Sequence, residues 1–204
     1  MTLASVAGVE PVERIAYLPD AEPPPGRLAL VQRFVNTVAP EWRQEMLSSP
    51  ERLRVVLAEL GLVSAAAPVS EIDLRRALDL RDAMRALALV HNGGPRAPEA
   101  EQTLEQIAAA ALGVRFENGV PRLVGTAPGV AGALATLVGV VVEAAAAGTW
   151  SRLKACPGEA CGWLFYDRSR NRSRRWCDMT VCGNRTKTRA YRARRRGSNH
   201  AVGG

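Results

Sequence analysis

A chain of 204 residues, 47% of them hydrophobic and 5% aromatic, is long enough to bury a core built mostly of alanine, leucine and valine. Its net charge of +7 is divided unevenly: residues 1–150 carry 13 basic and 17 acidic side chains (net −4), and residues 151–204 carry 14 basic and 3 acidic ones (net +11). A basic segment on a mildly acidic body indicates a polyanionic partner, and a merely solvated tail is disfavoured because this one also contains cysteine and tryptophan.

The N-terminal region has no positively charged start followed by a long apolar core. It therefore predicts no secretory signal and a cytoplasmic protein. The proline cluster that ends at Gly26 predicts a stiff lead-in over residues 1–26, without core-forming side chains.

Proline, glycine and capping residues divide the next stretch into helices. The start signals are clearest at Ser49, an N-cap followed by proline, and at Ser70, which begins a capping box with Asp73. Together with the apolar spacing, these signals predict helices over residues 27–39, 50–60, 71–91 and 98–112.

A small β-hairpin is predicted around Asn118-Gly119, the strongest short hairpin signal, because apolar side chains alternate on both sides of it. An alanine-rich helix is predicted next, over residues 128–149. The uncharged stretch from Leu123 to Val142 has the length of a membrane span, but its proline and four glycines favour a buried helix.

Catalytic chemistry is not expected of this chain. Its two histidines, His91 and His200, have no nucleophile or carboxylate near them in sequence and are predicted to be surface residues. The chain lacks a phosphate-binding loop with a lysine, and Gly125 to Gly132 suits close helix packing better than dinucleotide binding. We therefore expect a protein that is not an enzyme.

All cysteines of the chain fall within 27 residues, in two C-x4-C pairs separated by 15 residues: Cys156, Cys161, Cys177 and Cys182. Four thiolates in two close pairs match one structural, tetrahedral zinc ion; an iron–sulfur cluster, disulfides and a thiol redox switch are the alternatives. Gly162 and Gly183 are predicted to let the backbone approach the sulfurs. So small a segment lacks the apolar surface to fold alone, and metal binding would supply on the order of 10 kcal/mol.

Two basic elements surround the cysteines. Residues 168–175, here called the arginine loop, contain Arg168, Arg170, Arg172, Arg174 and Arg175. Residues 184–196, here called the basic helix, are predicted to begin at Asn184 as N-cap. Helical spacing aligns four of its arginines in one stripe, widened by three further cations: Arg185, Arg189, Arg192 and Arg196, with Lys187, Arg194 and Arg195. A second stripe of small residues is predicted to pack on the zinc site: Thr186, Ala190 and Ala193.

This arrangement predicts DNA binding, with the basic helix either entering the major groove or lying across phosphates. The same surface would permit RNA binding. A protein-interaction adaptor that docks on an acidic partner is the alternative from a different class.

The segment "RLKACPGEACGWLFYDRSRNRSRRWCDMTVCGNR", ending at Arg185, resembles the CGNR zinc-finger family. The preceding stretches "LALVQRFVNTV", "SPERLRVVLAELGL" and "GTWSRLKAC" resemble the ABATE domain, so the resemblance covers nearly the whole chain beyond its first 20 residues. It implies a bacterial stress-induced transcription regulator whose four cysteines bind zinc, and it names no ligand for the helical body.

The expected fold is thus mostly α, with one small hairpin in a helical N-terminal domain and a C-terminal four-cysteine zinc module that ends in the basic helix. Four parts are predicted: a lead-in (1–26), a helical domain (27–150), a zinc finger with the basic helix (151–197) and a flexible tail (198–204). The helical domain is expected to sense a signal or to form a homodimer.

Overall fold

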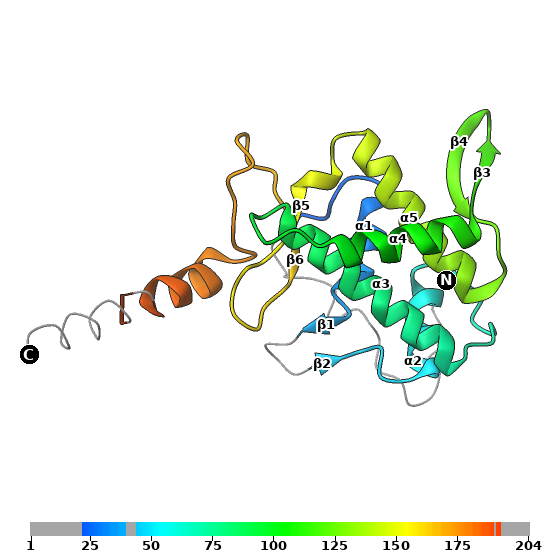
Figure 1. The fold of residues 1–204 in the computed structure, drawn as a ribbon, viewed down its shortest axis with the longest axis horizontal. Helices are drawn as coiled ribbons and strands as arrows, with labels where there is room; N and C mark the ends of the chain where they lie inside the picture. The colour runs from blue at the N-terminus through cyan, green and yellow to red at the C-terminus, as the bar shows by residue number, and fades with distance from the viewer. Residues whose placement is uncertain (1–21, 40–43, 190, 193–204) are drawn as a thin grey trace, which may run out of the picture.

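The computed structural model describes residues 22–39, 44–189 and 191–192. Figure 1 shows a helical body, with a β-hairpin projecting from one end and the basic helix leaving the other. The predicted fold class, mostly α with a small hairpin and a C-terminal cluster of four cysteines, is confirmed. Most of the predicted lead-in and the whole predicted tail lie outside the described residues.

The first helix, α1 (Leu28–Val35), is shorter than predicted. The chain leaves it at Asn36, whose side chain bonds to the backbone of Leu164, 128 residues further on. Residues predicted to be helical then form strand β1 (Val38–Ala39), paired with β2 (Gln44–Glu45). These strands depend on tertiary contacts that the local apolar spacing does not reveal.

The next three helices begin close to where their capping signals predict. In α2 (Pro50–Glu59), the hydroxyl of Ser49 accepts from the backbone N–H of Arg52. The capping box of Ser70 and Asp73 begins α3 (Glu71–Val90), and α4 (Pro98–Ala111) begins with its proline.

The predicted hairpin is confirmed as β3 (Leu112–Glu117) and β4 (Val120–Gly125). Asn118 and Gly119 have φ of 51° and 79°, which the two-residue turn requires. The hairpin lies against the helix that follows, and a Cβ on Gly125 would overlap the carbonyl of Gly132. These two glycines therefore permit close packing, as predicted.

The helix α5 (Gly129–Ala146) is the centre of the core, in contact with α1, α3, α4 and the hairpin. Its length and composition would suit a membrane span, but most of it is buried in the body, as in the core helix of a soluble protein. The predicted bounds, 128–149, were slightly too wide, and the uncharged stretch that was expected to form a buried helix begins in β4, which holds Leu123 to Gly125.

After α5, a short 3-10 turn (Trp150–Arg152) leads into strand β5 (Leu153–Ala155), which pairs antiparallel with β6 (Leu164–Tyr166). This second hairpin has two faces, because neighbouring residues of a strand point to opposite sides. Leu153, Ala155, Leu164 and Tyr166 join the core of the helical body. The opposite face carries Phe165 and packs with the cysteines.

Candidate metal centre

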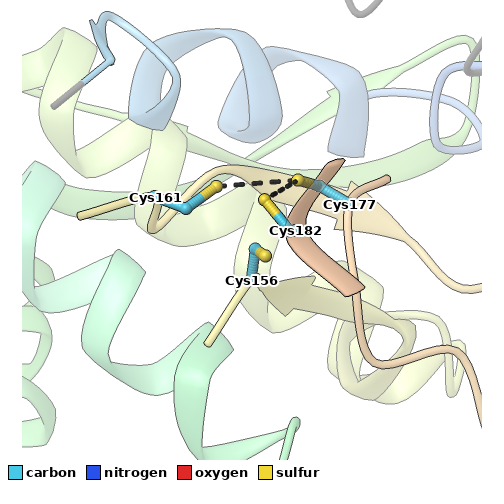
Figure 2. Close-up of side chains that lie close together, drawn as sticks. All are labelled: Cys156, Cys161, Cys177 and Cys182. Carbon is cyan, nitrogen blue, oxygen red and sulfur yellow. Dashed lines mark hydrogen bonds between the residues drawn. The ribbon is translucent and has the colours of Figure 1, made fainter. Parts of the chain in front are cut away.

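The four cysteines lie in three segments around the β5–β6 hairpin: the turn between its strands, the chain just after the arginine loop, and the turn before the basic helix. Cys156 directly follows β5, Cys161 lies three residues before β6, and Cys177 follows the arginine loop. Cys182 lies in a π-helical turn (Met179–Gly183) that precedes the basic helix. All four side chains are buried, and their sulfurs all lie within 4.8 Å of one another (Figure 2).

These distances fit a single ion bound by four sulfurs. The Sγ atoms of Cys161 and Cys177 are 3.6 Å apart, and those of Cys177 and Cys182 are 3.7 Å apart. With zinc–sulfur bonds of about 2.3 Å, the edges of a tetrahedron measure about 3.8 Å. A disulfide would require about 2.05 Å, and all four cysteines are free. A cluster of several irons needs a wider ring of sulfurs than this group provides.

The electrostatics of the four thiols also favour a cation. Hydrogen bonds from Cys161 and Cys177 lower the pKa of Cys156 to about 2. The hydrogen bond with Cys156 raises the pKa of Cys161 to about 12 and raises that of Cys177 as well. Burial, together with the charge on Cys156, raises the pKa of Cys182. One thiolate forms readily, and a divalent cation is needed to hold four.

The glycine that makes room for the sulfurs is Gly158, in the first turn. A Cβ there would lie 3.4 Å from the Sγ of Cys156 and 3.4 Å from that of Cys182. The prediction that Gly162 and Gly183 have this role is wrong. Gly162 provides a positive φ of 61° beside Arg85, and Gly183 packs against the sulfur of Met179.

The arginine loop is folded around one buried ammonium group. Lys154, on β5, donates to the carboxylate of Asp167 at 2.7 Å and to the carbonyls of Arg172 and Arg174 at 2.5 and 3.1 Å. These three acceptors use all three of its N–H donors. Lys154 therefore fixes the backbone of the arginine loop from the buried side.

Asp167 completes this anchor from the start of the loop. Its fully buried carboxylate also accepts from the backbone and hydroxyl of Ser169 and from the backbone N–H of Arg174. Burial acts to raise the pKa of Asp167, but the hydrogen bonds from Lys154 and Ser169 outweigh it and hold the pKa below its ordinary value. The charged pair is thus fully hydrogen-bonded inside the protein.

All five arginines of the loop are exposed, but three of them also bind within the chain. Arg174 lies over the ring of Phe165 and donates to the carbonyls of Trp176 and Cys177, next to the metal site. Arg168 pairs with Glu22 at 3.1 Å, and Arg172 donates to Ser151. Arg170 and Arg175 have no polar side-chain partner among the residues that the structure describes.

The basic helix begins earlier than predicted. The N-cap is Asp178, whose carboxylate accepts from the backbone of Thr180 and Val181, and the chain turns through the π-helical segment into the helix. Asn184 is already helical, so its prediction as the N-cap is wrong. This extension places Cys182 inside the helical segment, and the metal site thereby sets the direction of the helix.

The described part of the basic helix is exposed on every side (Figure 1). Arg185, Lys187, Arg189 and Arg192 are all exposed, and Arg189 pairs with Glu159 of the first cysteine turn. The predicted packing stripe fails at Thr186, which is exposed and whose hydroxyl donates to the carbonyl of Cys182. The remaining predicted residues lie outside the described side chains: Ala190, Ala193, Arg194, Arg195 and Arg196.

Polar side chains that directly follow α1 and α3 hold the module on the body. Asn36 makes two hydrogen bonds to the backbone of Leu164, and Asn92 donates to the carbonyls of Ala155 and Arg175, both at 2.8 Å. His91 donates from Nδ1 to the carbonyl of Leu153 at 2.8 Å and contacts Trp150 edge-on. It is a half-buried link in the structure, and the prediction of a surface residue is wrong.

Sequence reasoning missed Lys154, Asp167, Asn36 and Asn92. A signal for the first two was available, because a lysine flanked by apolar residues before a cysteine, and an aspartate directly after an aromatic strand, are charges at positions of expected burial. The two asparagines carried no such local signal.

Two family models match the chain. The ABATE model, described as "Putative stress-induced transcription regulator", matches residues 28–150, and the CGNR zinc-finger model matches residues 152–195. No curated protein matches the chain. Taken with the geometry of the four sulfurs, the second match assigns one zinc ion to this site.

Proposed function

Because this chain belongs to the ABATE family and ends in a CGNR zinc finger, we propose that it is a DNA-binding transcription regulator of the bacterial cytoplasm. The family description extends the proposal to a response to stress. No catalytic step is part of it. Zinc supplies structural cross-linking when it is bound; the chain's own cations make the contacts with DNA.

The observation that carries the proposal is the fixed backbone beneath the loop arginines. Lys154 and Asp167 hold the arginine loop while its guanidinium groups face solvent. Cations placed on an ordered backbone lose less conformational freedom on binding than cations on a mobile tail. Each phosphate contact releases condensed counterions, so such a surface binds duplex DNA with a strong dependence on salt.

The contacts of the structure rank the ten predicted DNA-binding residues. Arg174 is committed to carbonyls beside the metal site, and four more have a partner within the chain: Arg168, Arg172, Arg185 and Arg189. Arg196 lies outside the described residues. We assign the main phosphate contacts to four exposed cations that have no polar side-chain partner among the described residues: Arg170, Arg175, Lys187 and Arg192.

The test compares Arg170→Ala/Arg175→Ala with a matched pair on the body, Arg75→Ala/Arg76→Ala, whose arginines are exposed on α3. Loss of two phosphate contacts should make the slope of log K against log salt less negative by about 1.8 and weaken binding to a DNA duplex. The control pair should change neither. Unchanged DNA binding by the loop variant, at one zinc per chain, would refute the assignment.

A protein partner is the second candidate, because three apolar side chains lie exposed among the cations: Met179, Val181 and Tyr191. An acidic protein surface would use these side chains together with the cations. Such a partner would bind in competition with DNA and lose affinity on Val181→Ser, whereas nonspecific phosphate binding would be insensitive to that change. Titration with duplex RNA in the same way tests RNA binding, the remaining alternative.

For the helical body, the proposal keeps the two roles expected from sequence, signal sensing and dimerisation. Its hairpin at the far end from the basic helix offers a specific surface for the second role.

A further inference from the structure

The β3–β4 hairpin has two outer edges, and on the edge of β4 no outward N–H group is left open. On that edge, the N–H of Leu123 donates to Glu143 at 2.9 Å, and the N–H of Gly125 donates to Thr136 at 2.8 Å. The third outward position is Pro121, which has no N–H. The outer edge of β4 is therefore closed by α5 and by a proline.

These bonds also fix which groups of β3 point outward. Leu123 pairs with Val114, and Pro121 pairs with Phe116. Because the N–H of Leu123 points away from β3, these pairs are the ones that do not bond to each other across the hairpin. Val114 and Phe116 therefore direct their N–H and C=O groups to the outer edge of β3, where the described residues supply no partner.

The side chains at this edge are apolar and unusually exposed. Val114 is 61% exposed and Phe116 is 71% exposed, whereas Leu112 and Leu123 on the same face lie against α5 at Gly139. The apolar face of the hairpin thus continues from the core out into solvent. An isolated two-stranded hairpin is only marginally stable, and an open edge of this kind accepts a further strand.

We infer that β3 pairs antiparallel with β3 of a second copy of this chain, about a two-fold axis that passes beside Phe116. This register places the two Phe116 rings side by side and puts Arg115 opposite Glu117 of the partner subunit. At Phe116, whose N–H and C=O point outward, the axis gives a pair that exchanges two hydrogen bonds, whereas an axis at Arg115 would place two arginines opposite one another. The result is a four-stranded sheet in which residues 115–117 of the two β3 strands face one another.

Charge selects a second copy as the occupant. Within the hairpin, Arg115 lies directly opposite Arg122, an unfavourable like-charge pair. In the two-fold register, Glu117 of the partner subunit lies on the other side of Arg115 and offsets that repulsion. By symmetry the same pair forms in both halves of the dimer. An interface in which one patch contacts its own copy is the usual form of a two-fold dimer.

This inference concerns the dimerisation role proposed for the helical body and is independent of DNA binding. Figure 1 places the hairpin at the end of the molecule opposite the basic helix. Loss of DNA binding by the loop variants therefore leaves the oligomeric state unchanged, and the two proposals can fail separately.

The decisive experiment is sedimentation equilibrium of the full-length, zinc-loaded chain with reversed charges. Arg115→Glu and Glu117→Arg should each weaken the dimer at least about tenfold, because each places like charges opposite one another in both halves. The double variant Arg115→Glu/Glu117→Arg restores opposite charges and should recover the dimer. A monomer at all concentrations would overturn the inference, and this is also the result expected if β3 binds another protein instead. A dimer whose affinity does not change on charge reversal would overturn it as well.

Cysteine cross-linking checks the register by a second route. Directly opposite residues have Cα atoms about 5.5 Å apart, within the range that a disulfide bridges. Phe116→Cys should therefore form a covalent dimer under mild oxidation. Val114→Cys should not, since the two copies of this residue would lie about 13 Å apart. Equal cross-linking of both variants would reject the register.

Discussion

The arginine loop and the basic helix have the same chemistry but are held in different ways. The loop carries five arginines in eight residues and closes on itself around Lys154 and Asp167, on a hairpin that belongs to the core of the body. The basic helix is attached at one end, through Asp178 and Cys182, and is otherwise exposed. A basic sequence therefore does not say how firmly its charges are placed.

This difference separates two sources of order in one module. Buried ionic and backbone hydrogen bonds order the loop, and the metal site orders the start of the helix. Trypsin, which cuts after arginine and lysine, offers a direct measurement, because both elements are rich in its sites. Cleavage in each element should respond to a different perturbation.

The largest effect is expected from metal removal. Chelation of the full-length chain, or Cys177→Ser, should leave four or three close thiols without their cation, at a cost on the order of 10 kcal/mol of binding free energy. Cleavage by trypsin after Arg185, Lys187 and Arg189 should rise steeply, since the turn that begins the helix contains Cys182. Cleavage in the arginine loop should rise much less.

The body serves as the internal control for this experiment. Helices α3 and α5 contain no metal ligand, so their hydrogen exchange should be unaffected. Equal loosening of loop, helix and body on chelation would show that the metal, and not the buried ion pair, holds the loop.

The second prediction perturbs the arginine loop and leaves the basic helix in place. Lys154→Met leaves the buried carboxylate of Asp167 without its counter-ion, which should destabilise the protein by about 3–5 kcal/mol in urea unfolding. Cleavage after Arg170 and Arg172 should rise, while zinc content stays at one per chain. The double variant Lys154→Met/Asp167→Asn should recover part of the stability, because it removes the unpaired charge. Loss of zinc in the single variant would contradict the separation of loop and helix.

Local signals explain what the sequence predicted correctly. Capping at Ser49 and Ser70, the turn at Asn118-Gly119 and the spacing of the four cysteines all act over a few residues, and the structure confirms each. The choice of Asn184 as N-cap went wrong for a local reason as well: Asp178 is an equally good cap, and it lies further upstream.

The remaining features depend on contacts between distant segments. The early end of α1 follows from bonds between Asn36 and Leu164, and the anchor of the loop joins Lys154 to carbonyls 18 and 20 residues later. Strand β5 was missed because its three residues become a strand only when paired with β6. Such features require the fold to be known first.

A smaller effect is expected from pH, at the strand that carries Lys154. Burial lowers the pKa of His91, partly offset by its hydrogen bond to Leu153, and the charge of Lys154 lowers it further. Below the unfolded pKa of about 6.5, the unfolded chain therefore binds the proton more readily, and stability is lost as the pH falls from there through the folded pKa. The loss cannot exceed about 1.4 kcal/mol per pH unit for one proton.

Urea unfolding at pH 7.5, 6.5 and 5.5 measures this slope. His91→Gln keeps a hydrogen-bond donor but cannot titrate, so the difference between the two proteins should shrink as the pH falls. A difference that is constant with pH would mean that His91 contributes only its hydrogen bond.

The smallest effect tests the metal site from its backbone. Ala160 has φ of 59°, and a residue with a Cβ pays about 1 kcal/mol in this left-handed region. Ala160→Gly should therefore stabilise the first cysteine turn by up to about 1 kcal/mol in urea unfolding of the zinc-loaded chain. Gly162→Ala, on the other side of Cys161, is the matched change of opposite sign, because Gly162 has φ of 61° and a Cβ there would crowd Arg85. Both residues flank the ligand Cys161. If the two changes shift the free energy of unfolding in the same direction, metal binding, rather than backbone strain, sets the stability of this turn.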